Sequence, residues 1–189
     1  MQNLPEVSSV LEVGPGLGLV SAMLHNAGFS VTTFDRLPPQ YVHDEIKGVQ
    51  DEILQFDEEK LVDFDCILCC ETLEHLYWDE VDIVLEKFFR SKIRWVIISV
   101  PYQEFQLDFR FYFNKYRVRQ SVSLKLLKWM QKFKFDSQAD PYGHKWEIGY
   151  RGTKLRAFET KLTKAGFHIR RREFTSPTRS VFFMLENTG

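Results

Sequence analysis

Short apolar runs alternate with segments of helical periodicity along most of this chain, and this alternation constrains the fold more than any other feature. Apolar runs that predict strands lie at 9–13, 29–34, 48–50, 64–70 and 94–100. Helical spacing of apolar residues predicts helices at 17–27 and 79–89. Strands and helices that alternate in this way form a mostly parallel sheet with helices on both faces. We therefore expect a doubly wound α/β fold in three layers.

The C-terminal part of the chain predicts a change of strand direction. A helix is expected at 154–165, followed by strands at 167–174 and 181–186. The connection between these two strands is too short for a parallel crossover, so the pair should be antiparallel. The length of 189 residues suits a single domain that spans residues 1–189.

Residues 102–152 form an inserted segment that a minimal alternating fold does not need. Its first part, 102–135, is rich in aromatic residues with basic residues between them. Apolar residues at helical spacing predict an amphipathic helix at 121–135. We expect a lid or an acceptor-recognition segment. Contact of residues 110–135 with a membrane surface, or stacking of the aromatic residues on RNA bases, stays open as an alternative.

The composition narrows the classes of partner. The formal net charge is −1 and the sequence pI is about 6.5, so no overall field favours a nucleic acid. No apolar run reaches the length of about 18 residues that predicts a transmembrane helix, and the first residues do not resemble a signal peptide.

On the expected strand, Cys66 and Cys70 share one face and Cys69 lies on the other. We therefore expect reduced core cysteines, no metal site and a cytoplasmic protein.

A glycine-rich turn follows the first predicted strand. Gly14, Gly16 and Gly18 allow the backbone to turn tightly and to approach a ligand closely. Their spacing is GxGxG, whereas the dinucleotide fingerprint GxGxxG would need a third glycine at Leu19. Glu12, just before the turn, disfavours a pyrophosphate and favours an ammonium group. A nucleotide-linked oxidoreductase is therefore the weaker interpretation.

Polar residues follow the other predicted strands, and ligands of doubly wound sheets bind at these carboxyl ends. Asp35 ends the second strand, where a carboxylate can accept hydrogen bonds from ribose hydroxyls. Asp51 follows the third strand and can accept from an exocyclic amine such as that of adenine. Glu71 and Thr72 follow the fourth strand, on the rim of the same crevice. S-adenosylmethionine combines a ribose, an adenine and a cationic amino-acid portion.

The motifs VLEVGPGLG and FDCILCCETLEHL, with Asp35 between them, resemble those of class I S-adenosylmethionine-dependent methyltransferases. The stretch E-x-L-E-H is similar to the small-molecule branch of that family. The resemblance covers about residues 10–100 and 152–189. It implies a Rossmann-like, mostly parallel sheet of seven strands in which the last strand is antiparallel.

The resemblance also implies which residues bind S-adenosyl-L-methionine. Glu12 and the glycines would flank the methionine portion, Asp35 the ribose, and Asp51 with the following backbone the adenine. The chain at Cys70 and Glu71 would lie beneath the methionine amine. The full set of expected cofactor contacts is Glu12, Gly14, Pro15, Gly16, Gly18, Asp35, Arg36, Asp51, Glu52, Ile53, Cys70, Glu71, Thr72 and His75.

The expected reaction is direct in-line transfer of the sulfonium methyl group to an O or N nucleophile. The acceptor is expected to be a small molecule or a lipid- or sugar-like compound. A neutral hydroxyl would need a general base, and His144 is the first candidate because imidazole titrates near the working pH. His75 is the second candidate. A domain that binds the cofactor or a partner protein without turnover is the alternative.

Overall fold

The computed structural model describes residues 7–38, 44–57, 61, 63–103, 106–113, 118–125, 133–175 and 179–189, with 106–113 and 118–125 described by their backbone. A seven-stranded sheet has the order β3-β2-β1-β4-β5-β9-β8. Its strands are β1 (Ser9–Val13), β2 (Ser30–Asp35), β3 (Lys47–Gln50), β4 (Cys66–Cys70), β5 (Trp95–Pro101), β8 (His168–Phe174) and β9 (Ser180–Glu186). Each of them overlaps a predicted strand.

The pairing of the strands confirms the predicted directions. Strands β1 to β5 all run parallel to one another. Strand β9 is antiparallel to both β5 and β8, between which it lies. The sheet is therefore Rossmann-like and mostly parallel, with an antiparallel last strand.

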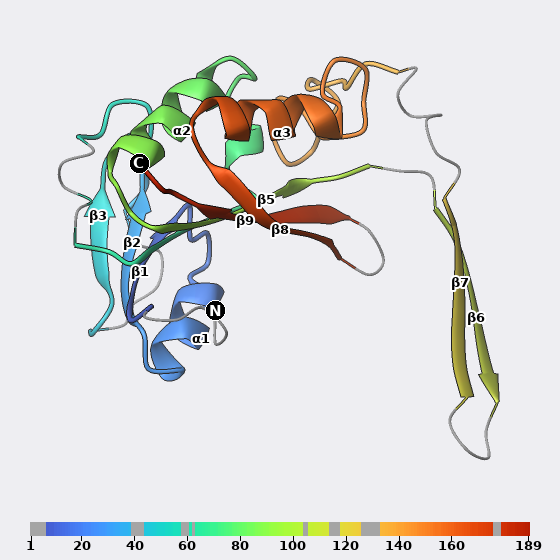
Figure 1. The fold of residues 1–189 in the computed structure, drawn as a ribbon, viewed down its shortest axis with the longest axis horizontal. Coiled ribbons are helices and arrows are strands. Elements are labelled where there is room, and N and C mark those ends of the chain that lie inside the picture. Colours follow the sequence, from blue (N-terminus) through green and yellow to red (C-terminus); the bar gives the residue numbers. More distant parts are fainter. Residues whose placement is uncertain are drawn as a thin grey trace.

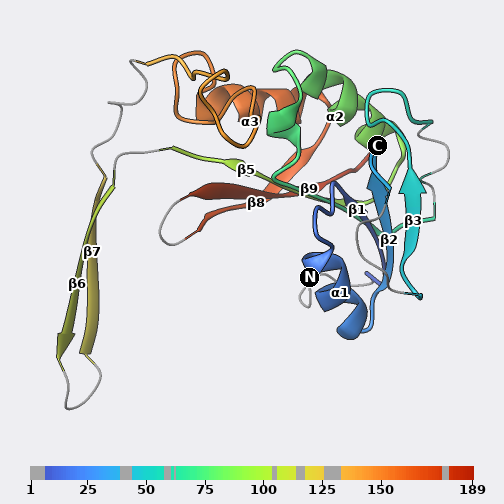
Figure 2. The same ribbon diagram turned by 180° about the vertical axis from the view of Figure 1, so that it is seen from behind.

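Helices cover both faces of the sheet. Helices α2 (Glu80–Arg90) and α3 (Leu155–Lys164) lie side by side over one face, and α1 (Leu19–Asn26) lies on the other (Figures 1 and 2). The apolar face of α2 is fully buried, with its residues at helical spacing: Val81, Val84, Leu85 and Phe88. This arrangement is the three-layer α/β/α order that the alternation predicts.

The core has one cluster on each face of the sheet. Cys69 belongs to the larger cluster beneath α2 and α3, whereas Cys66 and Cys70 belong to the smaller cluster with α1. The predicted alternation of the cysteines is therefore confirmed. Two large apolar residues of α1 face solvent in this structure, since Leu19 and Met23 are 69% and 71% exposed.

The inserted segment differs from its prediction. Strands β6 (Gln106–Phe113) and β7 (Val118–Lys125) form an antiparallel hairpin that extends away from the sheet (Figure 1). The amphipathic helix expected at 121–135 is wrong where it can be compared. Residues 121–125 are in β7, residues 133–135 are not helical, and 126–132 lie outside the described residues.

The period of the apolar residues explains why this part of the chain forms strands and not a helix. Phe109 is paired with Val122, and Leu107 with Leu124, so apolar residues two positions apart are partners in the register of the hairpin. This alternation of period two, with its β-branched residues, outweighs the few apolar residues at helical spacing. Within the described residues, no helix is long and apolar enough to cross a membrane.

Candidate functional site

The carboxyl ends of four parallel strands meet at one edge of the sheet. Strands β1 and β4 are neighbours there, and the chain leaves β1 toward β2 but leaves β4 toward β5. This reversal is the switch point at which α/β sheets bind ligands. The structure thus brings the residues after β1, β2, β3 and β4 to the same edge.

The glycine turn after β1 is held against the chain that follows β4. Gly14 has a φ of 70°, and a β-carbon added there would stand 2.4 Å from the Thr72 hydroxyl oxygen. The Thr72 hydroxyl lies 3.2 Å from the carbonyl oxygen of Val13 and donates to it. The backbone N–H of Gly18 donates to the carbonyl of Pro15 at 2.9 Å and closes the turn. Only glycine fits at position 14.

Glu12, in β1 and two residues before Gly14, carries a buried carboxylate. Its side chain is 5% exposed and accepts a hydrogen bond from the hydroxyl of Ser21 in α1. Burial raises the pKa of Glu12, and the bond from Ser21 opposes that rise. A buried carboxylate with one neutral donor is well suited to a cationic ligand group.

Asp35 and Asp51 lie side by side at the ends of β2 and β3. The backbone N–H of Asp51 donates to the carbonyl of Asp35 at 3.0 Å. Each carboxylate is oriented by a nearby backbone N–H, that of Leu37 for Asp35 at 2.9 Å and that of Glu52 for Asp51 at 2.8 Å. Ile53 follows in the turn and is half-buried against the core.

The backbone after β4 takes an unusual conformation. Glu71 has a φ of 50°, the left-handed region that residues with a side chain rarely adopt. Its carboxylate accepts a hydrogen bond from the Ser99 hydroxyl at 2.7 Å. Burial raises the pKa of the preceding Cys70 to about 11, so that its thiol stays protonated at neutral pH. The strained turn brings the residues that follow it toward the glycine loop.

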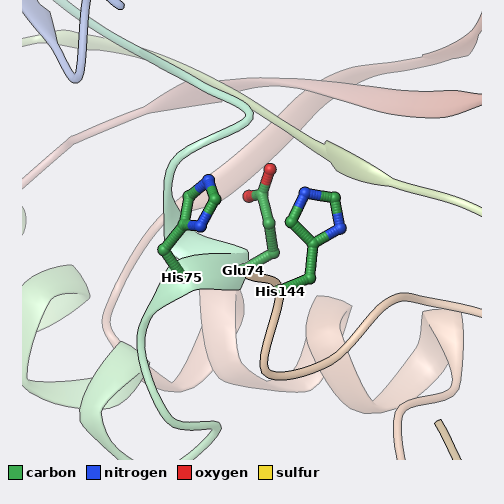
Figure 3. A group of neighbouring side chains, drawn as sticks. All are labelled: Glu74, His75 and His144. Atoms are coloured by element: carbon green, nitrogen blue, oxygen red, sulfur yellow. The ribbon is translucent and has the colours of Figure 1, made fainter. Parts of the chain in front are cut away.

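Three titratable side chains meet beyond this turn (Figure 3). Glu74 and His75 lie in a short 3-10 helix, η2 (Leu73–His75), and His144 lies in the loop before α3. The two imidazole rings are 5.1 Å apart, centre to centre, and nearly perpendicular. Partial burial and the neighbouring His144 lower the pKa of His75, which favours its neutral form. The positive charge of Arg36 also lowers the pKa of His75.

Packing of the chain after His144 holds the cluster together. The backbone N–H of Lys145 donates to the carbonyl of Glu74 at 2.7 Å, and the indole of Trp146 donates to the carbonyl of Leu76 at 3.1 Å. Trp146 also packs edge-on against Trp78 at 4.7 Å between ring centres. Both histidines predicted as candidate bases therefore face one another.

Two acidic residues of this cluster were not among the predicted site residues. Glu74 has a side chain with no exposed surface, although charged residues are rarely fully buried. Burial, with the charges of Glu71 and Glu147, raises its pKa to about 9. Glu147 accepts a hydrogen bond from Nδ1 of His144 at 3.0 Å. In the sequence, only the spacing of three residues between His144 and Glu147 indicated that these two side chains could interact.

Comparison with known proteins identifies the family. A family model described as a methyltransferase domain matches residues 1–147. The chain belongs to this methyltransferase family. No curated protein matches the methyltransferase sequence.

Solved structures share the fold of this methyltransferase at low sequence identity. The 1,6-didemethyltoxoflavin N1-methyltransferase of Burkholderia thailandensis, crystallised with 1,6-didemethyltoxoflavin and S-adenosylhomocysteine, has a TM-score of 0.62 at 15% identity over 96% of this chain and 71% of its own. The glycopeptide N-methyltransferase MtfA, in complex with S-adenosylmethionine, has a TM-score of 0.62 at 15% identity over 98% and 89%. The N-methyltransferase NodS of Bradyrhizobium japonicum, with S-adenosylhomocysteine, has 0.59 at 15% over 97% and 79%.

Proposed function

We propose that this chain transfers the methyl group of S-adenosyl-L-methionine to an O or N nucleophile of a small-molecule, lipid-like or sugar-like acceptor. The observation that carries the proposal is the buried carboxylate of Glu12, which lies just before the glycine turn. At the switch point this turn is in close contact with the chain after β4, through Gly14 and Thr72. This arrangement offers a cationic amino acid a counter-charge and close backbone contact. Family membership and the cofactors named in the three similar structures support the same conclusion.

The edge of the sheet has groups for each part of this cofactor. Glu12 binds the ammonium of the methionine portion, and the loop of Gly14, Pro15, Gly16 and Gly18 surrounds that portion. Asp35 accepts from the two ribose hydroxyls, with Arg36 beside it. Asp51 and the backbone at Glu52 and Ile53 contact the adenine. Cys70 and Glu71 lie beneath the methionine amine, with Thr72 and His75 nearby.

The chemical step needs alignment more than acid–base catalysis. The acceptor lone pair forms a bond to the methyl carbon while the carbon–sulfur bond breaks, and the sulfonium becomes a neutral thioether. Because the sulfonium is already a good leaving group, the main tasks are orientation and exclusion of water. A hydroxyl acceptor must also lose a proton. His144, oriented by Glu147, can receive it at Nε2, and His75 is the second candidate.

Titration calorimetry of the purified protein tests the cofactor assignment. We expect saturable binding of S-adenosylmethionine and of S-adenosylhomocysteine, and no binding of NAD. Binding of NAD alone would favour an oxidoreductase, and absence of binding by all three would overturn the proposal. Transfer of a labelled methyl group from the cofactor to a panel of hydroxyl and amine compounds then separates an enzyme from a binding domain.

A further inference from the structure

The cluster of Glu74, His75 and His144 has the composition and spacing of a metal site. One potential ligand atom from each residue lies within 4.8 Å of the other two. Figure 3 shows the carboxyl group of Glu74 between the two imidazole rings. Two imidazoles and one carboxylate are a ligand set that divalent transition metals use in catalytic sites.

The hydrogen bonds behind the two histidines leave one ring nitrogen of each for a ligand. Nδ1 of His144 is bonded to the buried carboxylate of Glu147, which leaves Nε2 on the side of the cluster. The imidazole of His75 is hydrogen-bonded to the backbone of Gly143. Histidines that bind metals are almost always held in this way, with the second nitrogen bonded to a carboxylate or a backbone carbonyl.

The buried carboxylate of Glu74 indicates that a ligand binds in this cluster. Both of its carboxylate oxygens are buried, and no other described residue donates a hydrogen bond to them. A buried polar group without a partner is costly, and native structures rarely contain one. A cation between Glu74 and the two imidazoles would satisfy the carboxylate.

Two other acidic residues near His144, Asp140 and Glu147, fit the role of metal ligand less well. Oδ2 of Asp140 accepts hydrogen bonds from the backbone N–H groups of Tyr142 and His144, each at 2.9 Å. Glu147 is likewise bonded to Nδ1 of His144. These two acids therefore orient the loop, whereas Glu74 is left for the ion.

We propose that Glu74, His75 and His144 bind one divalent transition-metal ion, with zinc as the reference ion. Magnesium and calcium are excluded as the preferred ions because they take oxygen ligands rather than imidazole. This proposal replaces the expectation of no metal site that the sequence alone supported. The cysteines on β4 remain core residues, since burial keeps their thiols protonated.

The role of the ion rests on the proposed methyl transfer, whereas its binding does not. Three protein ligands leave coordination positions open, and an acceptor oxygen or nitrogen can occupy one of them. The ion would then orient the acceptor beside the cofactor and lower the pKa of a bound hydroxyl. Nε2 of His144 would serve as a metal ligand rather than as the base, because one lone pair cannot do both.

Metal titration without cofactor tests the site directly. Untagged protein is treated with a chelator, dialysed, and titrated with zinc by calorimetry and with cobalt by visible absorption. We expect one ion per chain. Glu74→Gln, His75→Asn and His144→Asn should each weaken binding by more than about 100-fold, and Glu147→Gln by about 10- to 100-fold. His168→Asn, which changes an exposed histidine on β8, is the control and should bind like the wild type.

Several results would overturn the inference. These are absence of binding to folded wild-type protein, unchanged affinity in the three ligand variants, or a cobalt spectrum with thiolate charge-transfer bands. Circular dichroism establishes that each variant is folded, and Glu147→Gln tests the site even if Glu74→Gln does not fold. Calorimetry with S-adenosylhomocysteine separates the two proposals. Cofactor binding without metal binding removes only the metal site, and metal binding without cofactor binding removes the proposed function.

Discussion

Gly14 and Thr72 lie so close together that a β-carbon on Gly14 would stand 2.4 Å from the Thr72 hydroxyl oxygen. The contact joins the turn after β1 to the chain after β4, across the switch point of the sheet. Gly14→Ala should therefore displace the turn and weaken cofactor binding by at least about 10-fold, which calorimetry measures.

Gly28→Ala is the matched control for this substitution. Gly28 also has a positive φ, 93°, but an added β-carbon meets no atom within 4 Å. It lies before β2, at the opposite edge of the sheet from the turn. The control should lower the free energy of unfolding by about 1 kcal/mol and leave cofactor affinity unchanged. Equal effects of the two variants on affinity would remove the special role of the Gly14–Thr72 contact.

Replacement of Glu12 should change affinity and stability in opposite directions. Glu12→Gln keeps an acceptor for the Ser21 hydroxyl but removes the buried charge. Because burial raises the pKa of Glu12, the charged form opposes folding above the unfolded pKa of 4.5. We expect a higher melting temperature without cofactor at pH 7 and affinity reduced by about 10- to 100-fold. Unchanged affinity would exclude contact with the methionine ammonium.

The ribose assignment of Asp35 predicts a loss of binding when its charge is removed. Asp35→Asn should weaken both S-adenosylmethionine and S-adenosylhomocysteine by about 10- to 100-fold, because hydrogen bonds to a charged acceptor contribute about 1.5 to 3 kcal/mol. Asp63→Asn changes an exposed residue at the opposite end of β4 and is the control. Cofactor affinity like that of the wild type in Asp35→Asn would refute the assignment.

Substitution of His144 should affect turnover and spare the cofactor. His144→Ala removes one imidazole of the cluster and should reduce kcat by about 10²- to 10⁴-fold, whether it acts as a base or as a metal ligand. Affinity for S-adenosylhomocysteine should stay within about two-fold of wild type by calorimetry. Full activity of this variant with an identified acceptor would exclude both roles.

The hydrogen bonds of Asp65 should make the stability of the folded protein depend on pH in the acid range. Its carboxylate accepts hydrogen bonds from the backbone and hydroxyl groups of Ser8 and Ser9, at 2.8 to 2.9 Å, and joins the start of β1 to β4. These bonds, the Ser8 backbone first, lower its pKa to about 2 from 3.8. The stabilisation is complete above about pH 5 and is lost as the pH falls through 4 toward 2.

Asp65→Asn isolates that contribution. At pH 7 the variant should lose about 1 to 2 kcal/mol of unfolding free energy in denaturant titrations, and the difference from wild type should shrink as the pH falls from 4 to 2. Asp63→Asn again serves as the control. A difference that does not depend on pH would show that the charge of Asp65 is not the cause.

The hairpin and the buried glutamate mark the limits of prediction from this sequence. Apolar residues recur at helical spacing over 121–135, whereas Val122 and Leu124 fit the alternation of a strand, and pairing of 118–125 with 106–113 decided between the two. Glu74 is charged, and charged side chains are almost never fully buried unless they are paired. It is buried because the loop after His144 packs over it through Trp146 and the bond from Lys145 to its backbone carbonyl.

The sequence by itself determined the strands of the main sheet, the antiparallel last pair and the glycine turn, because periodicity and turn chemistry act between neighbours in the chain. It also brought the residues after β1 to β4 to one edge, since parallel strands must end together. Only the tertiary structure decided that Glu74 meets His144, and that the hairpin forms strands. Those contacts join segments that are distant along the chain, and burial of a charge depends on what the whole fold places around it.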